Sequence, residues 1–136
     1  MTNNNNHKIA VLGGGSFGTI IANMLAVNGH STTLWMRSAE QLQAIETSGE
    51  NAAYLPGFKL DSSLNFSTDI GQALEGVDTI FFAVPSSSFR KVAKLVNPWV
   101  NSETVLISAA KGIEAETFLL PSQILCLLYT SPSPRD

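Results

Sequence analysis

The sequence predicts an α/β domain built on a doubly wound parallel sheet. Short apolar runs alternate with helix-like segments from Lys8 onward, which is the pattern of strands covered by helices. The runs show little polar alternation, as is typical of strands buried on both faces. With 136 residues, of which 44% are hydrophobic, the chain can form one compact domain but not two.

Four apolar runs predict the strands. They are rich in β-branched and aromatic residues, and Pro85 closes the plainest of them. An irregular stretch, residues 58–67, leaves room for one more short strand. The four expected strands cover residues 8–12, 32–36, 79–84 and 104–108.

The first predicted helix covers residues 16–28 and ends at Gly29, a residue type favoured after a helix. Its large apolar residues recur at helical spacing and are expected to form its buried face. These residues are Phe17, Ile20, Ile21, Met24 and Leu25.

Three more helices are expected from their first residues. Ser38 and Gln41 have the spacing of a capping box, so a helix is expected to run to Ser48. Asp69 is expected to cap a short helix that stops at Gly76. Serines 86–88 are expected to cap a helix whose buried residues are Phe89, Val92, Ala93 and Val96.

The first strand leads directly into a glycine-rich turn with Gly-x-Gly-x-x-Gly spacing, the fingerprint of a dinucleotide-binding site. Gly13 allows the sharp turn, Gly15 leaves room for a pyrophosphate, and Gly18 lets the helix approach the strand. N–H groups at the helix start then bind phosphates. The alternative is a turn that needs glycine only for its geometry, and the flanking strand and helix disfavour it.

Arg37 follows the second strand, about twenty residues beyond the glycine turn, where dinucleotide-binding domains carry the residue that faces the adenosine ribose. An NAD-specific site usually has a carboxylate here. Arginine instead pairs with a 2′-phosphate and stacks on adenine. Arg37 therefore favours NADP, or the use of both cofactors, over the alternative of a solvated loop arginine.

Two other strands end in residues of chemical interest. Lys111 would face the cofactor cleft, where it could neutralise a phosphate or polarise a carbonyl; the alternative is a solvated charge. Val84-Pro85-Ser86 is equally consistent with a cofactor contact and with a plain end to a strand.

Composition argues against several other classes. The formal net charge is −3 and the eight Lys and Arg residues are scattered along the sequence, so no nucleic-acid partner is expected. The sequence has neither a membrane-length apolar run nor a signal-peptide pattern, and we expect a cytoplasmic protein. The single cysteine, Cys126, excludes an internal disulfide and a cysteine metal cluster, and no metal site is expected.

Taken together, these segments resemble the N-terminal half of bacterial soluble NAD(P)-dependent glycerol-3-phosphate dehydrogenases. The loop Asn-Ala-Ala-Tyr-Leu-Pro-Gly at residues 51–57 is the most family-specific piece. Gly14 replaces the alanine common in the family, and Phe17 stands where tryptophan or tyrosine is usual. The matching segments are residues 11–19, 28–30, 34–37, 51–57, 83–86 and 110–114, within a similarity that spans about residues 8–117.

The resemblance implies reduction of dihydroxyacetone phosphate to sn-glycerol 3-phosphate with NAD(P)H, a reaction that feeds glycerophospholipid synthesis. Ser16 and Phe17 would line the cofactor, Arg37 would face the adenosine 2′ position, and Lys111 would touch both the nicotinamide side and the substrate. In the family the proton donor is a lysine of a C-terminal helical domain, which this sequence lacks. The resemblance also admits a homodimer of the full-length enzyme.

The two ends are expected to lie outside the fold. Residues 1–7 read as a disordered tail, and residues 126–136 resemble the in-frame translation of a sequencing-library adapter, so we expect a non-native tail there. Residues 8–125 are then a truncated Rossmann-type NAD(P)-binding domain. We expect this fragment to provide cofactor binding only, without turnover, and to aggregate through uncovered apolar surface.

Two alternatives remain open at this point. Ketopantoate reductases, hydroxyacid dehydrogenases and UDP-sugar dehydrogenases share the glycine turn, but the 51–57 loop and Lys111-Gly112 count against them. The other alternative is a non-catalytic module that senses NADPH.

Overall fold

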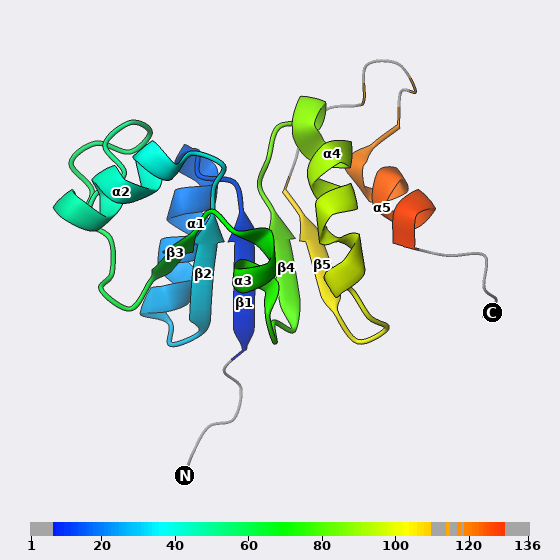
Figure 1. The fold of residues 1–136 in the computed structure, drawn as a ribbon, viewed down its shortest axis with the longest axis horizontal. Coiled ribbons are helices and arrows are strands. Elements are labelled where there is room, and N and C mark those ends of the chain that lie inside the picture. Colours follow the sequence, from blue (N-terminus) through cyan, green and yellow to red (C-terminus); the bar gives the residue numbers. More distant parts are fainter. Residues whose placement is uncertain (1–6, 110–113, 115–116, 118, 130–136) are drawn as a thin grey trace, which may run out of the picture.

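The computed structural model describes residues 7–109, 114, 117 and 119–129. Its five strands are all parallel and form one sheet in the order β3-β2-β1-β4-β5 (Figure 1). After β3 at one edge, the chain returns to place β4 on the other side of β1, which makes β1/β4 the switch point of the sheet. The strands are β1 (Lys8–Leu12), β2 (Ser31–Trp35), β3 (Asn65–Ser67), β4 (Thr79–Phe82) and β5 (Val105–Ser108).

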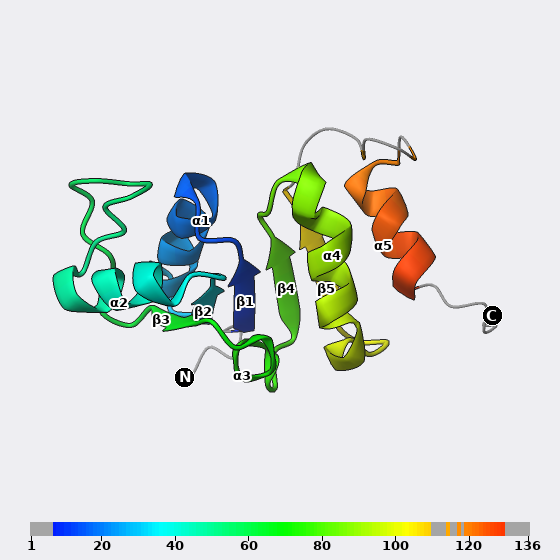
Figure 2. The ribbon, with the colours of Figure 1, turned by 45° about the horizontal axis from the view of Figure 1, so that its top comes forward.

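Helices cover both faces of this sheet (Figures 1 and 2). α1 (Ser16–Val27) lies on one face, where its small buried residues join an apolar cluster with β1 and β2. α4 (Ser86–Val96) lies on the opposite face, in a second cluster that includes the buried rings of Phe82 and Phe89. The remaining helices are α2 (Ala39–Ser48), α3 (Ile70–Leu74), α5 (Pro121–Tyr129) and the short 3-10 helix Asn97–Trp99. The predicted Rossmann-type doubly wound α/β fold is confirmed.

The buried face of α1 differs from the prediction. Phe17 and Met24 are more than half exposed, and Ile20, Ile21 and Leu25 are only partly buried. The helix lies so close to the sheet that a Cβ at Gly18 would stand 2.0 Å from the Gly13 carbonyl oxygen. Only small side chains fit such an interface. The buried residues are therefore Gly18, Thr19, Ala22, Asn23 and Ala26.

The start of α4 also corrects the sequence analysis. Pro85 takes the N-cap position, and no side chain caps the helix, so the serines do not act as predicted. The Ser88 N–H instead donates to the Pro85 carbonyl at 2.9 Å. The predicted buried face of this helix, from Phe89 to Val96, is confirmed.

Residues just outside both predicted ends of the domain, before residue 8 and after residue 125, make contacts with the fold. His7, assigned to the tail from sequence, donates its N–H to His30 Nδ1 at 3.0 Å, and its ring nitrogen lies 3.2 Å from Asp78 Oδ1. At the other end, α5 continues past residue 125 to Tyr129, and Leu128 packs against the core. Among the described helices, none is long and apolar enough to span a membrane.

Candidate functional site

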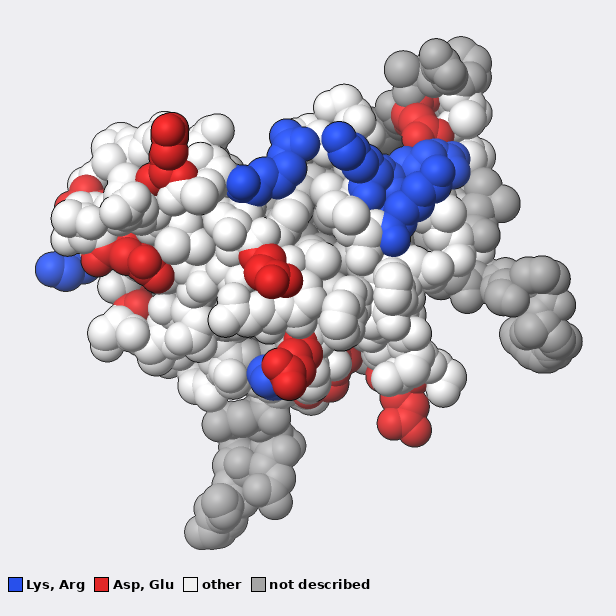
Figure 3. Space-filling model, viewed as in Figure 1, with Lys and Arg blue, Asp and Glu red and all other residues white. Residues whose placement is uncertain are grey.

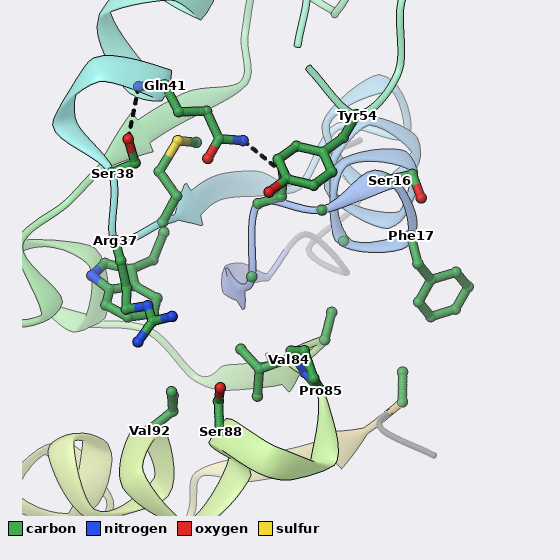
Figure 4. Close-up of a pocket in the computed structure, with 18 residues that line it drawn as sticks. Ser16, Phe17, Arg37, Ser38, Gln41, Tyr54, Val84, Pro85, Ser88 and Val92 are labelled. Carbon is green, nitrogen blue, oxygen red and sulfur yellow. Dashed lines mark hydrogen bonds between the residues drawn. The ribbon is translucent and has the colours of Figure 1, made fainter. Parts of the chain in front are cut away.

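A cleft of about 900 Å³ lies at the carboxyl ends of the strands, between the glycine turn and the start of α4 (Figure 4). Ligands of doubly wound sheets bind at this edge, beside the switch point. The cleft collects every predicted site residue in the described part of the chain, whereas Lys111 lies outside the described residues. Those lining residues are Gly13, Gly15, Ser16, Phe17, Gly18 and Arg37.

The three glycines of the fingerprint have different surroundings. Gly13 has φ +126°, and a Cβ there would stand 2.5 Å from the Ala83 carbonyl oxygen of the neighbouring strand end. Gly18 is confined even more tightly, because a Cβ there would stand 2.0 Å from the Gly13 carbonyl oxygen. A Cβ at Gly15, by contrast, would meet nothing within 4 Å. Packing of the protein itself thus requires the first and third glycines, whereas the second borders open space in the cleft.

Gly15 is also the N-cap of α1, and its side of the cleft is suited to an anion. No side chain caps the helix, and its first turn contains no acidic residue. The exposed Ser16 and Phe17 follow at once. The partial positive charge of the helix start is therefore left for a ligand rather than neutralised by the protein.

Arg37 and Phe17 lie on opposite sides of this cleft (Figure 4). Arg37 is exposed, because β2 ends at Trp35 and Met36 is the last buried residue before the loop. Its guanidinium extends toward the side formed by Val84 and Ser88. An arginine in this place can pair with a phosphate and stack on a planar ring.

Gln41 enters the site in a way that its spacing from Ser38 did not predict. Ser38 Oγ accepts the Gln41 N–H at 3.1 Å, so the expected N-cap of α2 is formed. The Gln41 side chain does not complete the capping box. Its Nε2 instead donates to the Gly14 carbonyl at 2.8 Å (Figure 4).

Sequence reasoning missed the roles of two residues in the 51–57 loop. Asn51 is only 1% exposed, and its Nδ2 donates to the Gly14 carbonyl and to Thr19 Oγ1, both at 2.8 Å. Tyr54, half-exposed, lines the cleft. The only sequence sign was the likeness of this loop to a family motif, since its hydrogen-bond partners lie far away along the chain.

Several basic side chains lie along one rim of the molecule (Figure 3), although Lys and Arg are scattered along the sequence. Helical geometry places Arg90, Lys91 and Lys94 of α4 close together. Arg37 adds another positive charge at the cleft. The charge of Arg90 is balanced by Glu114, so Lys91, Lys94 and Arg37 leave this rim positive even though the chain as a whole carries a net charge of −3.

Arg90 and Glu114 form a two-pronged ion pair that ties α4 to the segment after β5. Arg90 Nε lies 2.8 Å from Glu114 Oε2, and Arg90 Nη2 lies 2.9 Å from Glu114 Oε1. The hydrogen bond from Arg90, with another from Thr117, lowers the pKa of Glu114 to about 2. Glu114 comes three positions after Lys111 in the sequence.

Comparison with known proteins adds to this geometry. A family model described as NAD-dependent glycerol-3-phosphate dehydrogenase N-terminus matches residues 8–131. Glycerol-3-phosphate dehydrogenase (NAD(P)+) of Teredinibacter turnerae is 47% identical over 121 residues, a match that covers 89% of this chain and 36% of that protein. The chain thus spans about a third of the length of this curated relative.

Solved structures agree with the sequence match. The crystal structure of glycerol-3-phosphate dehydrogenase from Coxiella burnetii superposes with a TM-score of 0.86 at 29% identity, covering 93% of this chain and 38% of that one. A ketopantoate reductase from Ralstonia eutropha gives a TM-score of 0.69 at 25% identity, covering 89% and 38% of the two chains. The ketopantoate reductase alternative therefore has the same kind of fold but a weaker likeness.

Proposed function

Because the chain belongs to the family of NAD-dependent glycerol-3-phosphate dehydrogenase N-termini, we propose that it is the NAD(P)-binding part of an enzyme that reduces dihydroxyacetone phosphate to sn-glycerol 3-phosphate. The observation that carries the proposal is the open backbone at Gly15. It lies at the uncapped start of α1, in a cleft that also holds Arg37. The segment itself supplies cofactor binding, and turnover requires the longer protein.

The cleft residues fit a dinucleotide. The N–H groups at the start of α1, from Gly15 to Phe17, would hold the pyrophosphate, because no Cβ at Gly15 keeps it away from the backbone. Arg37 would hold the adenosine end, with Val84 and Pro85 along the wall of the cleft. Gly13 and Gly18 would act indirectly, by letting strand and helix come together beneath the turn.

Arg37 favours NADPH over NADH in this proposal. Its exposed guanidinium can form charge-assisted hydrogen bonds with a 2′-phosphate, and no carboxylate lines the described part of the cleft to repel that group. Lys91 and Lys94 of α4 add to the attraction for a ligand with several negative charges, whereas the charge of Arg90 is balanced by Glu114.

Lys111 would contact the substrate and the nicotinamide side. Bound NAD(P)H supplies the hydride that reduces the substrate carbonyl. Lys111 would offset negative charge on the substrate, and a lysine of the C-terminal domain would donate the proton. Glu114, three positions after Lys111 in the sequence, pairs with Arg90 of α4, the helix whose Ser88 and Val92 line the cleft.

The wider setting follows from the same proposal. The substrate is a small phosphorylated molecule, and the protein does not bind nucleic acid. The enzyme works in the cytoplasm and feeds glycerophospholipid synthesis, and the family resemblance admits a homodimer of the full-length protein. We also propose that residues 126–136 are not part of the natural protein, on the strength of their likeness to adapter sequence. Sequencing of adapter-free source DNA beyond the codon for Leu125 tests this point.

The main test is a substrate panel on the full-length protein that carries this segment. We expect oxidation of NADPH with dihydroxyacetone phosphate and none with ketopantoate or 2-oxo acids. The 136-residue chain is expected to give no turnover with any of them. Activity only with ketopantoate would replace the proposal by the reductase alternative, and tight NADPH binding without any turnover by the full-length protein would favour a sensing module.

A further inference from the structure

The carbonyl of Gly14 is held by two amide side chains from outside the glycine turn. Gln41 Nε2 from α2 and Asn51 Nδ2 from the following loop each lie 2.8 Å from the Gly14 carbonyl oxygen. The two amides are also joined to each other, because Gln41 Nε2 lies 3.2 Å from Asn51 Oδ1. A carbonyl oxygen has two lone pairs, and here both have a donor. We refer to Gln41 and Asn51 as the amide pair.

The Gly15 carbonyl, the next one in the turn, belongs to the same hydrogen-bond network. Thr19 Oγ1 donates to the Gly15 carbonyl at 2.6 Å and accepts from Asn51 Nδ2 at 2.8 Å. Thr19 is fully buried and Asn51 nearly so. Such a network has little freedom to rearrange, because each lost bond would leave a buried polar group unpaired.

Holding a carbonyl also orients the N–H of the same peptide. The described residues contain no cis peptide bond, so the C=O of Gly14 and the N–H of Gly15 lie in one rigid plane and point in opposite directions. With the oxygen directed at the amide pair, the Gly15 N–H is directed away from it. The same reasoning applies to the peptide between Gly15 and Ser16, whose oxygen is held by Thr19.

We propose that Gln41 and Asn51 are positioning residues that fix the Gly14–Gly15 peptide so that its N–H faces the pyrophosphate of the bound dinucleotide. This inference rests on the proposed function, since it takes the cleft to be the dinucleotide site. The network also reaches the loop that carries Tyr54. The Asn51 carbonyl accepts N–H groups from Tyr54 at 3.1 Å and Leu55 at 2.7 Å, so one residue holds both the glycine turn and this side of the cleft.

The test compares two ligands on the full-length protein. ADP-ribose contains the pyrophosphate, whereas 2′-AMP contains the adenosine end without it. Gln41→Met and Asn51→Leu remove the donors without adding charge and nearly preserve side-chain size. The matched controls are Gln43→Met on the exposed side of the same helix and Asn65→Leu on the exposed face of β3. Calorimetry measures ADP-ribose, ligand-observed NMR measures 2′-AMP, and thermal unfolding is recorded for every variant.

Each amide-pair variant is expected to weaken ADP-ribose binding by about three- to tenfold, which is the effect of losing one hydrogen bond from the Gly15 N–H to the pyrophosphate. Binding of 2′-AMP is expected to stay unchanged. The controls are expected to match the original protein with both ligands. If Asn51→Leu fails to fold, Gln41→Met carries the test, because Asn51 Nδ2 still donates to Gly14 and Thr19 in that variant and only the bond from Gln41 to Asn51 Oδ1 is lost.

Two results would overturn the proposal. One is ADP-ribose affinity in Gln41→Met equal to that of Gln43→Met. The other is an equal loss for both ligands, which would mean that the amide pair stabilises the fold without orienting the turn. Failure of the unaltered protein to bind ADP-ribose is a separate outcome, and it would reject the proposed cofactor site itself.

Discussion

Substitution of Gly15 by alanine should separate folding from cofactor binding. The residue has φ −76° and ψ −171°, an extended conformation that alanine adopts freely, and a Cβ there meets nothing within 4 Å. Replacing a glycine N-cap by alanine costs about 0.5–1 kcal/mol, and the reduced freedom of the unfolded chain gives back a similar amount. We therefore expect the free energy of unfolding to change by less than about 1 kcal/mol.

The same methyl group occupies the space into which a pyrophosphate would approach the backbone. Loss of one charge-assisted hydrogen bond costs about 1.5–3 kcal/mol, which corresponds to roughly a 10- to 150-fold weaker affinity for NADPH. Gly18→Ala provides the contrast, since its Cβ would stand 2.0 Å from the Gly13 carbonyl oxygen. Strand and helix would have to separate, at a cost of about 3 kcal/mol or more.

The assay pairs chemical denaturation with NADPH titration followed by fluorescence, for both alanine variants and the unaltered full-length protein. We expect Gly15→Ala to unfold normally but to bind poorly, and Gly18→Ala to be strongly destabilised. Normal NADPH affinity in Gly15→Ala would refute the reasoning, because the pyrophosphate would then not lie against this part of the turn.

Three further predictions concern charged residues. Arg37→Asp in the full-length enzyme should lower the ratio of kcat/KM for NADPH over NADH by roughly tenfold or more, and an unchanged ratio would remove Arg37 from the site. Lys111→Ala should reduce kcat/KM for dihydroxyacetone phosphate by about a hundredfold, whereas near-normal rates would indicate a solvated lysine. Because the pKa of Glu114 is lowered from 4.5 to about 2, its contribution to stability should be complete above pH 4.5 and lost as the pH falls toward 2. Acid unfolding of the unaltered protein and of Glu114→Gln measures this contribution as the difference between their free energies of unfolding. A difference that stays constant with pH would contradict the prediction.

The sequence predicted the sheet well because each buried strand is a local apolar run. The strand Thr79–Phe82 is one such case, and its neighbours across the sheet follow from the parallel α/β pattern. The face of α1 was predicted wrongly because periodicity counts large apolar residues. Close contact with the sheet instead selects small ones, and this becomes visible only once the Gly13–Gly18 approach is known.

The site was predictable only in part, for a related reason. The glycine turn and Arg37 are recognised from spacing along the chain, because in dinucleotide-binding domains the ligand contacts are made by the local backbone and by the next strand end. The hydrogen bonds that hold the turn join residues 27 and 37 positions apart, from Gln41 and from Asn51 to Gly14. No local pattern reports such contacts, and the capping-box spacing even suggested another partner for Gln41.

These contacts also bear on Gly14, the residue between the first two glycines of the fingerprint. A Cβ at Gly14 would stand 3.0 Å from Gln41 Nε2 and 3.0 Å from Met36 Cβ, tighter than ordinary van der Waals contact. Because glycine has no Cβ at this position, the Gln41 side chain comes within hydrogen-bonding distance of the Gly14 carbonyl without being displaced. The direction of the Gly15 N–H thus depends on the residue before it and on a helix that follows the second strand. In this chain, the backbone of a fingerprint usually described through its three glycines is thus held by hydrogen bonds from residues far outside it.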